Sequence, residues 1–183
     1  MSVASTWSMS TRELLVCSAI AVVSSVVLVP ALWMQATVAV AVPGLYAVFS
    51  GAILFGPVLA QSMLKRGGVA LATSLIGALA IMPLTPRGSA MLVPLALQGL
   101  FLEALFAVDG YRRWQTWRWP VACLGVGVVH AAGVWVALDL ASMNTVYATV
   151  TIAVVVLSYL GWPLAALALR SRLALAGVGV SAA

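Results

Sequence analysis

Long apolar runs separated by short polar or charged breaks make up most of this 183-residue chain. A run of about 20 apolar residues is long enough to cross the hydrocarbon core of a bilayer as a helix. Arg12 and Glu13 precede the first run, and Pro83, Pro86 and Gly88 mark a loop in which no helix can continue. The pattern predicts six membrane-spanning helices with approximate bounds 14–34, 38–64, 69–82, 89–108, 120–138 and 145–169.

The third run is shorter than the others. It covers residues 69–82, whereas a fully spanning helix needs about 17–25 residues. This segment therefore crosses the membrane as a short helix, is tilted, or is partly re-entrant, and the sequence leaves these alternatives open.

Basic residues fall almost entirely in alternate breaks between the runs. Cytoplasmic loops of membrane proteins carry an excess of Lys and Arg. With the N-terminus in the cytoplasm, only Arg87 lies outside. The basic residues then on the cytoplasmic side are Arg12, Lys65, Arg66, Arg112, Arg113, Arg118, Arg170 and Arg172. This distribution predicts that both termini are cytoplasmic.

Composition agrees with a membrane location. Hydrophobic residues make up 64% of the chain and charged residues 7%, compared with about 25% charged residues in soluble domains. A soluble globular enzyme is therefore excluded. We expect one all-α bundle of six transmembrane helices over residues 1–183, in the plasma membrane, and we interpret the net charge of +5 as a topology signal rather than a nucleic-acid site.

Two ionisable residues lie well inside predicted spans. Glu103 is in the fourth span and His130 is near the middle of the fifth. Charged groups are costly at this depth and are functional candidates for that reason. Both residues are candidates for binding a substrate, and a structural role for each stays open. No metal site is predicted, because such a site normally needs three or four ligands.

Aromatic and amide side chains gather toward the predicted outer face. Aromatic rings stack on planar heterocycles, while amides and hydroxyls recognise their polar edges. An interfacial aromatic belt is the alternative explanation. The candidates for substrate binding in this group are Trp33, Tyr46, Trp135, Asn144 and Tyr147. Gln98, at the middle of its span, is a further candidate that provides a polar floor beneath them.

Small residues recur every four positions in the first span, at Cys17, Ala21 and Ser25. Such a stripe lets another helix approach closely. It is a candidate interface for a partner subunit, although packing within the bundle is the more common use. The chain has no G-x-x-x-x-G-K-[ST] motif, so we expect no cofactor in it and any use of ATP to belong to partner subunits.

Several segments resemble the substrate-binding (S) components of energy-coupling-factor (ECF) vitamin transporters, closest to the YkoE-like branch associated with thiamine or its hydroxymethylpyrimidine precursor. Most distinctive are residues 97–106, with Gln98 and Glu103, followed by Tyr-Arg-Arg-Trp at 111–114; residues 11–15 and 51–57 are similar as well. The resemblance implies a six-helix vitamin-binding subunit that is not itself an enzyme. It further implies partnership with a transmembrane T component and two ATP-binding-cassette ATPases.

The hypothesis from the sequence is that a thiamine-type or hydroxymethylpyrimidine-type heterocycle binds at the outer face. Aromatic side chains would stack on it, His130 and the amides would hydrogen-bond its edge, and Glu103 would offset a positive charge. Two alternatives are an intramembrane enzyme that uses Glu103 and His130, and an assembly subunit that binds no ligand.

Overall fold

The regular elements in the described part of the chain are all helices. A computed structural model describes residues 9–38 and 43–177. In chain order the elements are α1 (Thr11–Val38), α2 (Pro43–Phe49), η2 (Ser50–Leu54), α3 (Phe55–Leu64), α4 (Val69–Ile81), η3 (Met82–Leu84), η4 (Gly88–Met91), α5 (Leu92–Ala107), α6 (Arg118–Ala137), η5 (Leu140–Ser142) and α7 (Thr145–Leu175). The predicted all-α class is confirmed over these residues, whereas residues 39–42 of the second predicted run lie outside them.

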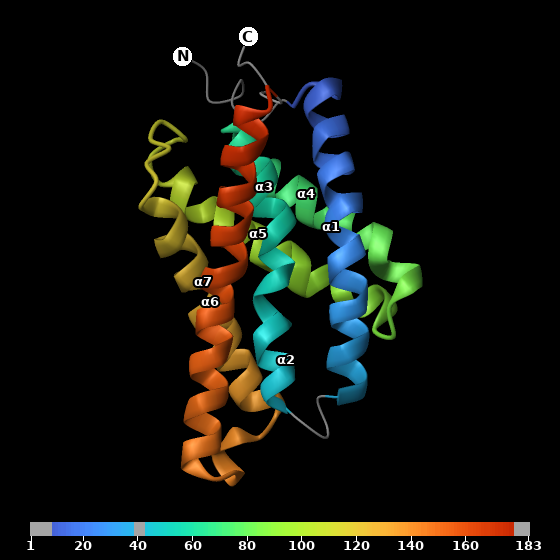
Figure 1. Cartoon of the computed structure of the whole chain (residues 1–183), viewed down its shortest axis with the longest axis vertical. Coiled ribbons are helices and arrows are strands. Elements are labelled where there is room, and N and C mark those ends of the chain that lie inside the picture. Colours follow the sequence, from blue (N-terminus) through green and yellow to red (C-terminus); the bar gives the residue numbers. More distant parts are fainter. Residues whose placement is uncertain (1–8, 39–42, 178–183) are drawn as a thin grey trace.

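Five helical segments are long and apolar enough to cross a membrane. They are Thr11–Thr37, Tyr46–Leu64, Gly88–Ala107, Arg118–Ala137 and Thr145–Leu175. The α4 helix has 13 residues and is about 20 Å long, which is less than the roughly 30 Å of a bilayer core. The predicted count of six spans therefore stays a prediction for this short helix. In Figure 1, α1, α6 and α7 follow the long axis, while α4 and α5 lie at a slant.

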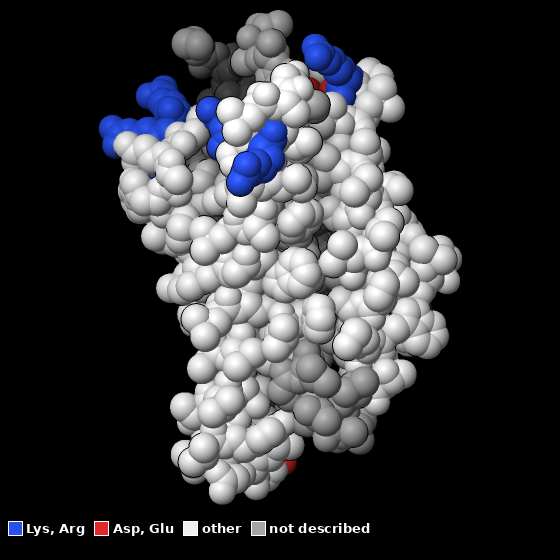
Figure 2. Space-filling view, in the orientation of Figure 1, with Lys and Arg blue, Asp and Glu red and all other residues white. Residues whose placement is uncertain are grey.

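Basic side chains gather at one end of the bundle. Figure 1 places the start of α1 and the end of α7 at this end, and Figure 2 shows Lys and Arg side chains concentrated there. Arg66 pairs with Glu13 at 2.7 Å, and Arg118 pairs with Asp109. The arrangement agrees with the distribution expected from the sequence, and the assignment of this end to the cytoplasm remains a prediction.

The second span contains a break in its α-helical geometry. The 3₁₀ segment η2 separates α2 from α3, and backbone groups near it bond to side chains of α7. The Gly51 N–H donates to Ser158 Oγ at 2.9 Å, and the Ser158 hydroxyl donates to the Val48 carbonyl at 2.6 Å. Trp162 Nε1 donates to the same carbonyl at 3.1 Å. Three hydrogen bonds thus hold the broken span against α7.

The small-residue stripe of α1 faces the inside of the bundle. Cys17, Ala21 and Ser25 are all buried. Cys17 packs with residues of α3 and α4, and a Cβ at Gly77 of α4 would lie 3.9 Å from the Ala21 Cβ. Burial of all three side chains favours internal packing, one of the two uses left open by the sequence. The use of this stripe as a partner interface stays a prediction.

Replacing Gly51 by alanine is expected to destabilise the protein. A Cβ at this position would lie 2.2 Å from the Ser158 carbonyl oxygen, so the second span and α7 would have to separate. Overpacking of this kind costs about 1–3 kcal/mol, which corresponds to a fall in Tm of about 2–12 °C. Thermal unfolding of the purified protein measures the change.

Gly161→Ala is the matched control on α7, because nothing lies within 4 Å of a Cβ at that position. Its Tm should equal or slightly exceed that of the wild type. Equal Tm values for Gly51→Ala and Gly161→Ala would contradict the importance of the close approach.

Candidate functional site

A cavity of about 390 Å³ opens between α2, α5, α6 and the α4–α5 connection. Organic ligands occupy sites of about 300–1,000 Å³, so this one has room for a small molecule. Its walls are mainly aliphatic and include few polar groups. The lining residues are Tyr46, Arg87, Pro94, Leu97, Gln98, Phe101, Val126, Val129, His130, Gly133, Val134, Ala137 and Leu138.

Helical periodicity explains which residues form two of the walls. On α5 the lining positions 94, 97, 98 and 101 follow the i, i+3, i+4, i+7 spacing of one helix face, and on α6 positions 126, 129, 130, 133, 134 and 137 do the same. Gly133 carries no side chain, and nothing lies within 4 Å of a Cβ built there. This glycine therefore leaves room on the wall beside His130.

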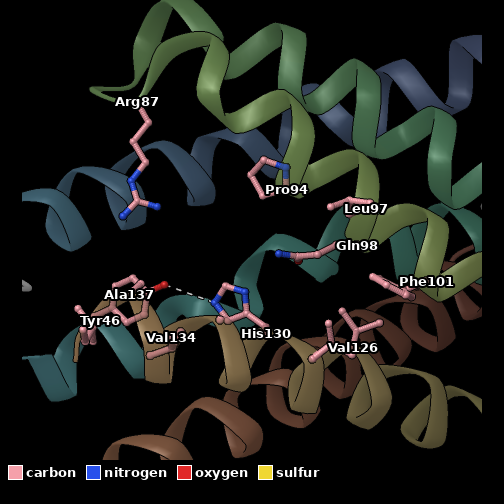
Figure 3. Close-up of a pocket in the computed structure, with 13 residues that line it drawn as sticks. Tyr46, Arg87, Pro94, Leu97, Gln98, Phe101, Val126, His130, Val134 and Ala137 are labelled. Atoms are coloured by element: carbon pink, nitrogen blue, oxygen red, sulfur yellow. Dashed lines mark hydrogen bonds between the residues drawn. The ribbon is translucent and has the colours of Figure 1, made fainter. Parts of the chain in front are cut away.

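Two hydrogen-bonded pairs hold the polar groups of the cavity. The Tyr46 hydroxyl lies 3.3 Å from His130 Nε2, which joins α2 to α6 (Figure 3). The Tyr159 hydroxyl of α7 donates to Gln98 Oε1 at 3.2 Å, and its ring lies 5.1 Å from the imidazole of His130. Because the Gln98 oxygen accepts this bond, the amide nitrogen is the end directed into the cavity in Figure 3.

Three of the predicted binding residues come together here, and the other five lie elsewhere. Tyr46, Gln98 and His130 line the cavity. Trp33 is half-exposed and its Nε1 donates to the Leu84 carbonyl at 2.9 Å. Trp135 is exposed on α6 outside the lining.

The remaining two aromatic or amide candidates belong to the start of α7. The Asn144 side chain accepts a hydrogen bond from the Val146 N–H at 2.9 Å and so caps the helix. Tyr147 is half-buried and packs against the main core cluster. Neither residue is in the cavity wall.

Glu103 is buried and serves the opposite end of the bundle. Its Oε1 accepts the Ala70 N–H at 2.8 Å, and its Oε2 accepts the Tyr111 hydroxyl at 2.8 Å. Ala70 is in the first turn of α4, where a carboxylate satisfies a free N–H group and interacts favourably with the helix dipole. The structure thus places Glu103 at the start of α4 and outside the wall of the cavity.

The Tyr111 side chain completes this cluster. Its ring packs over Gly67, where a Cβ would lie 2.7 Å from the ring. Burial and the Glu103 carboxylate both raise the pKa of the Tyr111 phenol above its ordinary value, so the phenol keeps the proton that it donates. The cluster therefore joins the α3–α4 turn to the end of α5.

Arg87 and Phe101 line the cavity although the sequence analysis did not select them as binding residues. Phe101 is one helical turn after Gln98, so its position on the same face was available from spacing. In the sequence, Arg87 stands out only as the single basic residue on the predicted outer side. Within residues 9–38 and 43–177, no group of three or more His, Cys, Asp or Glu is arranged to hold a metal ion.

Glu103→Ala is expected to destabilise the protein, because it leaves the buried Ala70 N–H and the Tyr111 hydroxyl without their acceptor. The cost of such unpaired groups is about 1–3 kcal/mol, measured as a lower Tm. Glu103→Gln keeps an oxygen that can accept from the Ala70 N–H, so its Tm should fall less than that of Glu103→Ala.

A double-mutant cycle provides the control. Tyr111→Phe removes one of the two hydrogen bonds, so the combined Glu103→Ala and Tyr111→Phe change should cost less than the sum of the single changes. Strict additivity would show that the two side chains do not act together.

Comparisons with known proteins identify a transport family. The family described as "ABC-type cobalt transport system, permease component" matches residues 12–131, well over half of the chain. A solved structure, "Crystal structure of an S-component of ECF transporter", is 24% identical, with a TM-score of 0.82 over 93% of this chain and 88% of that chain. This similarity shows a shared fold. No curated protein matches significantly. The chain is a multi-pass protein of the plasma membrane, and it belongs to the family of permease components of ABC-type cobalt transport systems.

Proposed function

We propose that this chain is the substrate-binding subunit of an ECF-type importer and that it captures a small organic solute at the outer face of the membrane. The observation that carries the proposal is the cavity of about 390 Å³ into which Tyr46, Gln98 and His130 converge from three helical segments. A mainly apolar cavity with a few convergent polar groups is typical of a ligand site. The fold shared with an ECF S component supports the same assignment.

The cavity supports an organic substrate better than a bare cobalt ion. Transition metals are held by several His, Cys, Asp or Glu side chains. Among the residues that line this cavity, His130 is the one member of that set, and Arg87 adds a positive charge. A divalent cation would meet one imidazole and a repelling guanidinium.

Of the two heterocycle types suggested by the sequence, the uncharged hydroxymethylpyrimidine suits the cavity better than the thiamine cation. Tyr46 and Phe101 provide ring surfaces, and the Gln98 amide nitrogen is placed to donate to a ring nitrogen. No carboxylate is among the lining residues, since Glu103 is bonded at the start of α4. Hydroxymethylpyrimidine is therefore the first ligand to test.

Truncation of the cavity wall should weaken ligand binding. Isothermal titration calorimetry of the purified protein with hydroxymethylpyrimidine is expected to give saturable binding. Gln98→Ala and Phe101→Ala should each raise Kd about 5- to 10-fold, the effect of one lost hydrogen bond or ring contact.

Leu100→Ala is the matched control for this experiment. Leu100 is half-exposed on the same helix as Phe101 but is not part of the cavity wall, so its Kd should equal that of the wild type. Absence of heat with hydroxymethylpyrimidine, thiamine, biotin and riboflavin, in a sample with a cooperative thermal transition, would overturn the proposal.

The proposed partners are a transmembrane T component and two ATPases that supply the energy of transport. Affinity purification of the chain from its native membrane should recover one T component and ATP-binding-cassette ATPases, with ATPase activity in the complex. Recovery of the folded chain alone, together with ligand uptake that does not depend on ATP, would contradict an ECF-type importer.

A further inference from the structure

Among the described residues that line the cavity, one side chain is charged, and it is a cation. Arg87 lies in the connection between α4 and α5 and is part of the cavity wall. The ion pairs found within the described residues are Arg66 with Glu13 and Arg118 with Asp109. Over residues 9–38 and 43–177, the guanidinium of Arg87 forms no ion pair or hydrogen bond with the protein.

None of the four acidic residues of the chain forms an ion pair with this guanidinium. Glu13 and Asp109 belong to the two ion pairs, and Glu103 accepts bonds from Ala70 and Tyr111. Asp139 starts the turn between α6 and α7 and is not a lining residue. The protein itself therefore supplies no counter-charge within the cavity wall.

The Gln98 amide adds a second hydrogen-bond donor to the cavity, so the cavity favours a ligand that carries hydrogen-bond acceptors. In Figure 3 the Arg87 guanidinium extends toward the space in front of the Tyr46–His130 pair, and the Gln98 amide nitrogen faces the same space. Arg presents up to five N–H donors and no acceptor, and the Gln98 oxygen already accepts the bond from Tyr159. Arg87 and Gln98 thus present N–H donors from two sides.

We infer that the ligand of this cavity carries an anionic group, a carboxylate or a phosphate, that pairs with Arg87. The inference rests on the proposed substrate-binding function and goes beyond it, because an uncharged ligand such as hydroxymethylpyrimidine would occupy the organic part of the site and leave Arg87 unpaired. The planar guanidinium fits either group with two parallel hydrogen bonds. Aliphatic walls such as Pro94, Leu97 and Val134 exclude water and strengthen the attraction. The organic part of the ligand then lies deeper, against Phe101 and Gln98.

Matched ligand pairs that differ in one anionic group test the inference. For the phosphate, the probes are hydroxymethylpyrimidine and its phosphate ester; for the carboxylate, they are biotin and biotin amide. Titration of the protein in a phosphate-free maltoside detergent removes lipid headgroups as an alternative source of anion. We expect one anionic probe to bind about 10- to 100-fold more tightly than its uncharged partner, with an affinity that falls as salt is added.

Variants at the arginine connect this preference to the side chain. In Arg87→Gln, the Kd of the anionic probe of the preferred pair should rise to that of the uncharged probe, whose own Kd should not change. Arg87→Lys should keep part of the difference between the two Kd values. Arg112→Gln, which changes an exposed arginine at the other end of α5, should leave both Kd values unchanged.

Four outcomes overturn the inference, and they distinguish its failure from failure of the proposed function. If uncharged probes bind as tightly as anionic ones, or if Arg87→Gln preserves the preference, the anionic ligand class is wrong and a substrate-binding subunit still stands. An effect of Arg87→Gln that appears only in phospholipid nanodiscs would assign the arginine to lipid headgroups instead. If neither pair nor thiamine nor riboflavin binds to the folded protein, the proposed function fails and the inference fails with it.

Discussion

A membrane interior offers no water to a backbone N–H or C=O that leaves its helix, and this constraint governs how the bundle is assembled. The second span departs from α-helical geometry at residues 50–54, so its released groups need partners from another helix. Ser158 bonds the Gly51 N–H and the Val48 carbonyl at once, and Trp162 bonds that carbonyl as well. Since Gly51 has no side chain, α7 can come close enough for these bonds. The repair holds the span that carries Tyr46 in place beside the cavity.

The same requirement accounts for the buried carboxylate. The first turn of α4 has N–H groups without helical partners, and Glu103 of α5 accepts one of them at Ala70. An acidic side chain used in this way is committed to joining two helices at the basic end of the bundle. Its charge is consequently not available to a cationic ligand, and the electrostatic character of the cavity is set by Arg87. The hydrogen bond from Ala70 to Glu103 at one end of α5 thus affects which ligands suit the cavity at the other end of this helix.

The helical class and most span bounds were predictable because charged residues are rare here and nearly all of them lie at the ends of apolar runs, Glu103 being the exception. The grouping of Tyr46, Gln98 and His130 in one place agrees with their expected depth. Glu103 could not be placed from the sequence, because an ionisable residue in a span looks the same whether it faces a ligand or a helix end. The direction of the Cys17, Ala21 and Ser25 stripe was equally undetermined, since small residues permit close packing with any neighbour. The surroundings of Glu103 and the direction of the stripe both depend on contacts between segments that are distant in the sequence.

The length of the short third run, which forms α4, determines where Arg87 lies. An α4 of 13 residues reaches about 20 Å, and in Figure 1 the α4–α5 connection ends well before the turn between α6 and α7. A longer α4 would carry this connection, and Arg87 with it, away from Tyr46 and His130. At the observed length the connection stops where its guanidinium faces Tyr46 and His130. Arg87 is the one basic residue on the predicted outer side, and the short α4 brings it to the cavity wall. The length of α4 therefore helps to determine the charge of the site.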